Sequence, residues 1–433
     1  MASTYLTRTP SSSGNRKTWT FSTWFKRSKI AAGQKIFCVQ GDSSNLFECY
    51  FNSNDTLAFY HYSSNGGVTD SFLGTNQVFR DTSAWYHLVL AVDTTQGTAS
   101  NRVKMYINGE QVTSFSSASY FNQNYDTYIN WTYEHRIGAN LSGALFFNGS
   151  MSHIHLIDGT AYTPSAFGST DSTTGEWKIN TSPSVTYGTN GFFILKDGNS
   201  VTDASTNSNN FTVGGGTLTK TEDCPSNVFC TMNPLTTTHH TFSNGNLSIN
   251  GADSKTSVGS LGVNTGKWYW EAKITGSSSY GQYAGATTIE NENHWDNAPN
   301  SSAANVRTWG GNGNYHNYTQ SGSTADSDII STTGTVYGYA LDLDNGTMKY
   351  YVNGTLTHTD STIPSDNSKT FFPVSGTTNS GGGGWQGADY NFGNGYFGTT
   401  AVSSAGTNAS GIGIFEYDVP TGFTALSTKG LNE

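Results

Sequence analysis

The chain has 433 residues with a formal net charge of −10 at pH 7; 12% of the residues are charged and 34% are hydrophobic. Disordered chains combine low hydrophobicity with high charge and few aromatics, so the 13% aromatic content excludes that class. Glycine is frequent but has no three-residue period, which excludes collagen, and the negative charge argues against a nucleic-acid binder. This mixture of aromatic, Gly, Ser, Thr and Asn residues is typical of many short strands joined by polar turns.

Targeting and covalent cross-linking signals are weak. Residues 1–14 lack the apolar core of a signal peptide, and no apolar run approaches the ~18 residues of a membrane span, so we expect synthesis in a cytosol. The chain has 4 cysteines. Cys38 and Cys49 flank a turn-like segment and could face each other across a hairpin, while Cys224 and Cys230 lie around a proline. Cytosolic synthesis favours free thiols in both pairs.

Period-2 patterns predict strands along the whole chain. In 18–25, Trp19, Phe21 and Phe25 share one face. Segment 84–93 is apolar on both faces, which is typical of a central strand. In 266–274 apolar and polar residues alternate. We expect the inward residues to be Trp268, Trp270, Ala272 and Ile274. The outward residues are expected to be Tyr269, Glu271 and Lys273.

The two halves of the chain repeat one arrangement. A buried strand, an Asp-led turn and a second strand end at Asn108-Gly109 in the first half and at Asn353-Gly354 in the second. Asn-Gly supplies the positive φ angles of a tight hairpin. We therefore predict an all-β protein with two antiparallel β-sandwiches, at 1–168 and 236–433, joined by an irregular bridge at 169–235 that packs on one of them.

Several strings resemble known families. The strings TFSTWF, WYHLV, YING, RIG and GSMSHIHLIDGTAYTPSAFG, all before residue 169, resemble a laminin-G-like, concanavalin A-type jelly roll. The last string is similar to virion proteins of tailed bacteriophages of marine bacteria. From about His239, the strings GKWYWEAKI, GYALDLDNGTMKYYVNG, FFPVSG and NFGNGYF resemble a SPRY domain. The resemblance implies two concanavalin A-like sandwiches.

No catalytic pattern accompanies these folds. Glycan cleavage needs two carboxyl groups facing one sugar, and no strand face carries such a pair at suitable spacing. Asp342 and Asp344 share a face but are expected to cap a turn, and Glu290 and Glu292 lie in a polar loop. We therefore predict no enzymatic activity.

The sequence also contains no residue pattern that identifies a metal site. We expect His153 and His155 to lie on the outward face of a strand whose inward residues are Ile154 and Leu156. No cofactor is predicted. A structural calcium ion is compatible with the loop acids of the jelly roll, Asp42, Asp55, Asp70 and Asp93, but no spacing selects a site.

Loop aromatics are the candidate ligand-binding residues, because a flat ring stacks on the apolar face of a sugar. The first cluster, 120–136, contains Tyr120, Tyr125, Tyr128 and Trp131. The second, the long polar loop 290–320, contains Trp295, Trp309, Tyr315 and Tyr318, and we expect this loop to be exposed at the end of the protein farthest from its anchor. A third is centred on Trp385. These rings would equally suit loop packing or protein interfaces.

The resemblance implies a virion surface protein. The leading hypothesis is a bacteriophage tail-fibre or appendage component for host adhesion, with other virion proteins and a host-surface glycan or receptor as partners. Capsid decoration or a head fibre is the first alternative, a glycan-cleaving enzyme the second and an extracellular lectin the third. A homo-oligomer is expected, with a trimer as the guess. The basic residues near the N-terminus are a candidate anchor: Arg16, Lys17, Lys26, Arg27 and Lys29.

Overall fold

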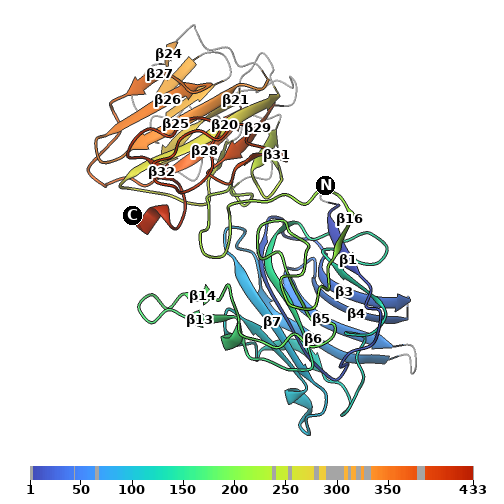
Figure 1. Ribbon diagram of the computed structural model, residues 1–433. Helices are drawn as coiled ribbons and strands as arrows, with labels where there is room; N and C mark the ends of the chain where they lie inside the picture. Colours follow the sequence, from blue (N-terminus) through green and yellow to red (C-terminus); the bar gives the residue numbers. More distant parts are fainter. Residues whose placement is uncertain are drawn as a thin grey trace. The chain divides into compact units, whose positions relative to one another are not determined.

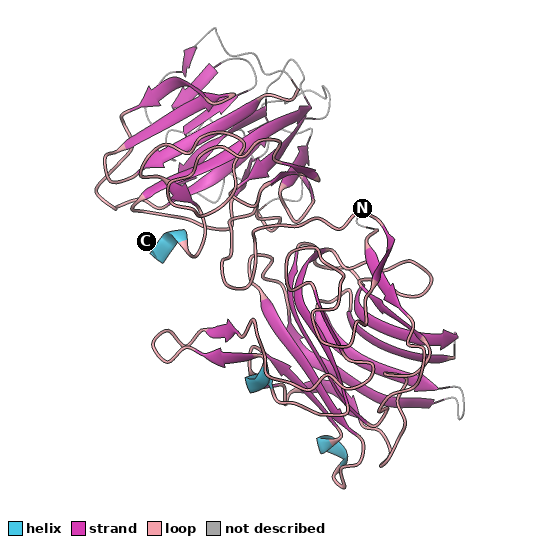
Figure 2. Ribbon diagram, viewed as in Figure 1, coloured by secondary structure: helices cyan, strands magenta, loops and turns pink. Residues whose placement is uncertain are grey.

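The computed structural model divides the chain into two compact units, unit 1 at Met1–Lys220 and unit 2 at Thr221–Glu433 (Figure 1). The structure describes residues 3–432 except 43, 64–67, 237–239, 252–255, 277–281, 289–306, 311–313, 318–322, 326–332 and 378–385. Across the described residues the chain forms strands and loops, and helix is limited to short 3₁₀ turns (Figure 2). The predicted all-β architecture of antiparallel sheets is confirmed. The boundary between the units falls inside the segment 169–235.

Unit 1 is built from two facing sheets and a small hairpin. Its strands are β1 (Tyr5–Arg8), β2 (Thr18–Arg27), β3 (Gln34–Asp42), β4 (Asn45–Phe51), β5 (Thr56–Ser63), β6 (Val68–Val78), β7 (Tyr86–Asp93), β8 (Val103–Ile107), β9 (Glu110–Gln111), β10 (Phe115–Ser119), β11 (Glu134–Ile137), β12 (Gly149–Asp158), β13 (Gly168–Thr170), β14 (Trp177–Ile179), β15 (Phe192–Ile194) and β16 (Thr212–Gly215). One sheet has eight strands in the order β10-β6-β5-β4-β3-β11-β1-β16. The other has six, β15-β12-β2-β7-β8-β9, and β13 pairs with β14.

The core of unit 1 lies between these sheets and follows the predicted faces. Trp19, Phe21 and Phe25 of β2 are fully buried in it. The predicted central strand is β7, which lies between β2 and β8 with buried residues on both faces. The N-terminal strand β1 pairs with β11 on one side and with β16, more than 200 residues later, on the other.

The outer face of β12 is covered by a later strand. Ile154 and Leu156 face the core as expected, but His153 and His155 are only 9% and 2% exposed. The later strand β15 pairs with β12, and its Phe193 ring lies 3.9 Å from the ring of His155. His153 and His155 therefore lie on the face opposite to the core, as predicted, but a segment distant in sequence covers that face.

Unit 2 repeats the two-sheet arrangement. Its strands are β17 (Thr241–Ser243), β18 (Ser248–Gly251), β19 (Thr256–Val258), β20 (Lys267–Gly276), β21 (Gln282–Thr288), β22 (Arg307–Gly310), β23 (Asn314–Asn317), β24 (Ser323–Ala325), β25 (Val336–Asp342), β26 (Thr347–Val352), β27 (Thr355–Asp360), β28 (Phe371–Thr377), β29 (Gln386–Asn391), β30 (Tyr396–Phe397), β31 (Thr400–Ala401) and β32 (Thr424–Ala425). One sheet runs β17-β18-β29-β20-β25-β26-β27, with β32 added to β20 in parallel. The other runs β19-β28-β21-β22-β23-β24.

Strand β20 is buried on both faces. Trp268 and Trp270 are 4% and 0% exposed in the core, which confirms their prediction. Tyr269 and Glu271, predicted to point outward, are also buried, at 1% and 0%. The C-terminal segment covers them: Phe415, Val419 and Phe423 form a second small cluster with Tyr269. Both residues therefore point away from the main core, as predicted, and the C-terminal segment buries them.

The predicted turns have the expected geometry. Asn108 and Gly109 have φ angles of 49° and 86°, and Asn353 and Gly354 have 47° and 81°. The Asp342 carboxylate accepts hydrogen bonds from the backbone and side-chain nitrogens of Asn345, at 2.9 and 2.8 Å. Asp342 therefore caps the turn, as predicted.

None of the four cysteines, all of which lie in the described part of the chain, forms a disulfide. Cys38 pairs in register with Glu48, whereas Cys49 pairs with Phe37. Neighbouring register positions point to opposite faces of a sheet, so Cys38 and Cys49 cannot face each other. Among the described residues, no helix reaches the length and apolar character of a membrane-spanning segment.

Candidate functional site

The loop aromatics predicted at 120–136 pack onto unit 1. Tyr128 is 6% exposed, its ring stacks on His61 at 4.5 Å, and its hydroxyl donates to Asn45 Oδ1 at 2.7 Å. Tyr125 stacks on Phe121 at 5.1 Å, and the partly buried Tyr120 packs against the core. These rings hold the loop against the sandwich.

Trp131 is also engaged within unit 1. The Arg16 guanidinium lies 3.7 Å from the centre of its ring, and the Tyr133 ring lies 4.7 Å away. The indole therefore already has aromatic and cationic partners. Of the five basic residues in the candidate anchor, Arg27 and Lys26 are buried, at 0% and 4% exposed, whereas Arg16 and Lys17 are partly exposed and Lys29 is exposed.

The second predicted cluster is only partly described. Trp295, Tyr318 and Trp385 lie outside the described residues. Trp309 lies on β22 and Tyr315 on β23, and the two are direct cross-strand partners. The segment predicted as a loop therefore includes a β-hairpin that extends the β28–β21 sheet.

A different set of aromatic residues covers the outer face of the eight-stranded sheet. Phe47, Phe59 and Leu73 face the core, so their neighbours along the strands face away from it. These neighbours form what we call the aromatic tract, which consists of Tyr50, Tyr60, Tyr62 and Phe72. All are partly exposed. Tyr60 stacks with Tyr62 and meets Phe72 edge-on, both at 6.2 Å between ring centroids.

Local packing positions two rings of the tract, those of Phe72 and Tyr50. A Cβ added at Gly74 would lie 2.9 Å from the Phe72 ring, so the absence of a side chain there admits the ring. Lys35 Nζ lies 3.9 Å from the centre of the Tyr50 ring and 2.5 Å from Glu48 Oε2. Burial, followed by the Glu48 charge, raises the pKa of Tyr50, so its hydroxyl stays protonated and can donate.

Strand register aligns residues of the tract with residues of the other strands in a row across the sheet, of which Cys38 and Arg136 are buried. The partners in one row are Phe72, Tyr60, Glu48, Cys38, Arg136, Thr7 and Thr212. Six strand spacings of about 4.8 Å give a row of roughly 29 Å. From β6 to β16, the row contains first aromatic side chains, then charged side chains and finally threonine hydroxyls. The sequence analysis did not identify the aromatic tract because β5 carries aromatic residues on both faces. The pattern that could have identified the tract is the alternation of Phe59 and His61 with Tyr60 and Tyr62.

A buried Ser–His pair in unit 1 has part of the arrangement of a catalytic serine. Ser22 Oγ lies 2.8 Å from His87 Nε2, and Trp177 Nε1 donates to His87 Nδ1 at 3.0 Å. Burial lowers the pKa of His87 to about 3, so the ring is neutral. Since Nδ1 accepts from the indole, Nε2 carries the proton and donates to Ser22. The pair cannot take a proton from the serine.

The loop acids considered for calcium each have their own protein partners. Asp55 binds Arg27 and Arg80, Asp70 binds His61, and Asp93 binds Thr95 and Gln96. Asp42 accepts from Ser44 and Asn45 within its own turn. Within the described part of the chain, no group of three or more His, Cys, Asp or Glu residues has the arrangement of a metal site.

Comparison with known proteins agrees with the two-sandwich fold. Residues 2–161 match the model of the Concanavalin A-like lectin/glucanases superfamily, and residues 267–387 match that of the SPRY domain. The search of curated proteins gave no match.

Solved structures give distant matches. The SPRY domain of human HERC1 is 18% identical, with a TM-score of 0.29 over 37% of this chain and 96% of that one. A putative carbohydrate binding protein from Bacteroides ovatus is 16% identical, with a TM-score of 0.35 over 51% and 58%. The Ruminococcus gnavus IT-sialidase CBM40 is 18% identical, with a TM-score of 0.25 over 32% and 75%. By the two family models, the N-terminal part of the chain is similar to the Concanavalin A-like lectin/glucanases superfamily and the C-terminal part to the SPRY domain.

Proposed function

We propose that this protein is a non-enzymatic adhesion protein whose N-terminal domain binds a glycan on the aromatic tract. The observation that carries the proposal is the group of partly exposed rings of Tyr50, Tyr60, Tyr62 and Phe72 on a sheet face that the core does not use. Rings held on a rigid sheet lose little conformational entropy when a sugar stacks on them.

Polar groups beside the rings supply the hydrogen bonds that a sugar needs. Glu48 accepts from hydroxyls, and Lys35 and the tyrosine hydroxyls donate to them. Because Lys35 and Glu48 form an ion pair, the tract carries little net charge and suits a neutral sugar chain. The SPRY domain is proposed as a second binding domain, for a receptor or another virion protein.

A double substitution tests the tract. Tyr60→Ala with Tyr62→Ala is expected to weaken binding to host-surface polysaccharide by about tenfold or more, since two stacking surfaces are lost. Tyr120→Ala and Trp131→Ala, in the loop cluster, serve as matched controls that should bind normally. Loss of binding in the loop variants but not in the tract variants would contradict the proposal. Release of reducing sugar from the polysaccharide would contradict the non-enzymatic role.

The cellular setting follows from the resemblance to tailed-phage virion proteins. We place the protein on the virion as a tail-fibre or appendage component, assembled as a homo-oligomer, with a trimer as the working stoichiometry. Antibody labelling of virions in the electron microscope tests the location. Label on the tail supports this setting, and label on the capsid would support head decoration instead. Light scattering of the purified chain tests the trimer.

A further inference from the structure

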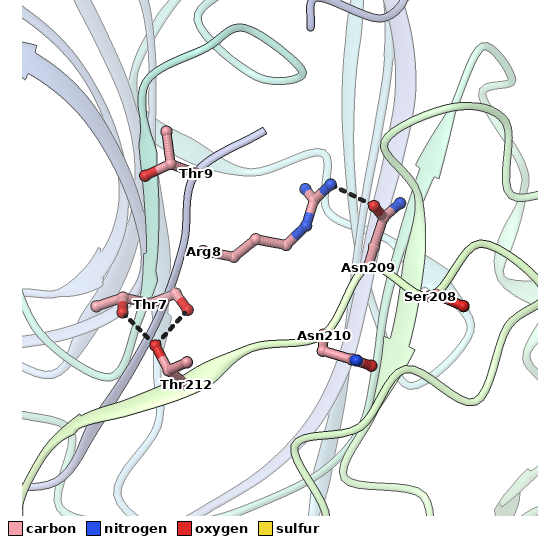
Figure 3. Close-up of a pocket in the computed structure, with 7 residues that line it drawn as sticks. All are labelled: Thr7, Arg8, Thr9, Ser208, Asn209, Asn210 and Thr212. Atoms are coloured by element: carbon pink, nitrogen blue, oxygen red, sulfur yellow. Dashed lines mark hydrogen bonds between the residues drawn. The ribbon is translucent and has the colours of Figure 1, made fainter. Parts of the chain in front are cut away.

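A separate polar pocket lies at the far edge of the eight-stranded sheet. Its volume is about 390 Å³, and it lies between the end of β1 and the segment that leads into β16 (Figure 3). The lining residues are Thr7, Arg8, Thr9, Ser208, Asn209, Asn210 and Thr212. They offer hydroxyls, amides and one guanidinium, with no carboxylate and no apolar side chain among them. Such a lining matches a ligand that is polar on all sides.

Arg8 is held in place by a fixed neighbour. Its Nη2 donates to Asn209 Oδ1, and Figure 3 shows the side chain extended toward that residue. The Asn209 amide nitrogen donates to the carbonyls of Thr189 and Gly191, at 3.0 and 2.8 Å. These contacts fix which end of the amide faces Arg8. The guanidinium is therefore ordered before any ligand arrives, which lowers the entropic cost of binding.

The Arg8 charge is not satisfied by an ion pair. Among the described residues, no carboxylate lies within ion-pair distance of it, and its buried Nη1 has no hydrogen-bond partner. Asp203 and Asp158 act on Arg8 only through space. Their oxygens accept instead from nitrogen donors, such as Phe193 N for Asp203 and Asn190 N for Asp158. The two carboxylates compensate the Arg8 charge only from a distance, and the carboxylate of a ligand in the pocket would add a direct contact.

We propose that this pocket binds the carboxylate of an acidic sugar residue, such as a uronic acid. Arg8 pairs with the carboxylate, while Thr7, Thr212 and Asn210 exchange hydrogen bonds with the sugar hydroxyls. The volume lies near the lower end of the range for ligand pockets and suits one sugar ring. The proposal rests on the proposed glycan-binding role but uses residues separate from the aromatic tract, so each site can fail alone.

Titration of the full chain with sodium galacturonate and with galactose tests the pocket. Galacturonate is expected to bind about tenfold more tightly than galactose, because only the acid forms a charge-assisted hydrogen bond with Arg8. Arg8→Gln should abolish this preference. Lys29→Gln, which removes the same charge from an exposed position in the same unit, is the matched control and should keep it. Equal affinity for the two sugars in the unsubstituted chain would overturn the proposal.

Thr9 provides a test that leaves Arg8 in place. Thr9 is exposed and lines the pocket. Thr9→Glu would supply an internal carboxylate and is expected to remove the preference for galacturonate, whereas the neutral, equally long Thr9→Gln should retain it. The comparison of these two Thr9 variants tests the role of the Arg8 charge even if Arg8→Gln fails to fold. Sodium acetate and sodium sulfate binding as tightly as galacturonate would show a general anion site and overturn the sugar assignment. Tyr60→Ala with Tyr62→Ala should leave galacturonate binding unchanged even if the tract proposal fails.

Discussion

The indole of Trp177 donates its Nε1 hydrogen to Nδ1 of His87 over 3.0 Å, and the two rings stack with centroids 6.0 Å apart. Trp24 stacks on the same imidazole at 4.8 Å. A Cβ added at Gly109 or Gly168 would lie 2.5 or 2.7 Å from Trp177 ring atoms, so both glycines make room for the indole. This contact fastens the β13–β14 hairpin to the outer face of the six-stranded sheet.

Trp177→Ala is therefore expected to release that hairpin locally, with little change in the global free energy of unfolding. Limited proteolysis should then cut within 169–180, where the unsubstituted chain resists. Lys178→Gln is the control, since it removes only the exposed ion pair with Asp171, and solvent screens such pairs. Equal cleavage of the tryptophan variant and the unsubstituted chain would contradict the anchoring role.

Glu271 fastens the C-terminal segment of unit 2. Its carboxylate accepts from the backbone nitrogens of Glu416 and Tyr417, both at 2.9 Å. Asn391 Nδ2 and the Tyr269 hydroxyl each donate to it at 3.2 Å. Glu271→Gln places an amide among these donors and should lower the free energy of unfolding by about 1–3 kcal/mol, because at least one buried N–H loses its acceptor.

The pH dependence of Glu271 gives a second readout. Burial raises its pKa from 4.5 to about 7, although four hydrogen bonds to the charged form oppose the shift. The folded state therefore binds this proton more tightly than the unfolded state. Its contribution to stability is complete below pH 4.5 and is lost as the pH rises toward 7. Denaturant unfolding between pH 4.5 and 8 should show this loss in the unsubstituted chain and a flatter profile in Glu271→Gln. Parallel profiles would contradict the assignment.

Buried histidines make the stability of unit 1 depend on pH in the opposite direction to that expected from Glu271. Burial lowers the pKa of His87 to about 3, and that of His135 and His153 to about 4. The unfolded state takes up these protons first, near pH 6.5, so stability falls as the pH drops from there toward 4. Each group contributes at most about 1.4 kcal/mol per pH unit in this window. Calorimetry of the full chain at pH 7 and pH 5 should show the unit 1 transition move to lower temperature at pH 5.

Asp55 forms one ion pair with a buried arginine and one with an exposed arginine, so the stability contributions of the two pairs can be compared. It binds Arg27, which is 0% exposed, at 3.0 Å, and Arg80, whose side chain is 57% exposed, also at 3.0 Å. Arg27→Met leaves part of the buried Asp55 charge uncompensated and should destabilise unit 1 by about 3–5 kcal/mol. Arg80→Gln should cost less than about 1 kcal/mol. Similar costs for the two variants in urea denaturation would contradict this ranking.

Trp270 tests the core of unit 2. Its ring is fully buried and stacks with Tyr339 at 5.8 Å. Trp270→Ala should lower the free energy of unfolding by about 3–5 kcal/mol, the usual cost of removing a large core aromatic. A loss below about 1 kcal/mol would mean that the surrounding side chains refill the space.

Local alternation predicted the inward residues and could not predict what covers the other face. In β20 the inward positions Trp268 and Trp270 followed from period 2 alone. The burial of Tyr269 and Glu271 depends on Phe415 and Val419, about 145 residues later, and no local pattern reports such a partner. His155 and Phe193 show the same effect in unit 1.

The binding site also depends on contacts between residues that are distant in sequence, which local patterns do not predict. Loop aromatics such as Tyr128 stand out by composition, but their position against His61 comes from tertiary packing. Tyr60 and Glu48 share one row only because β4 and β5 pair in that register. Strand register across a whole sheet is a long-range property, so the aromatic tract became visible only in the folded chain.

The pairing of β1 with β16 also sets an order of events during synthesis. Thr7 leaves the ribosome early, but its partner Thr212 is made some 200 residues later. Until then one edge of β1 lacks its partner strand, and unpaired strand edges invite pairing with other chains. Unit 2 has a similar closure, since Cys230 donates its backbone hydrogen to Leu426. Each nascent unit therefore passes through a long open interval, during which a chaperone that covers strand edges would raise the yield of folded protein.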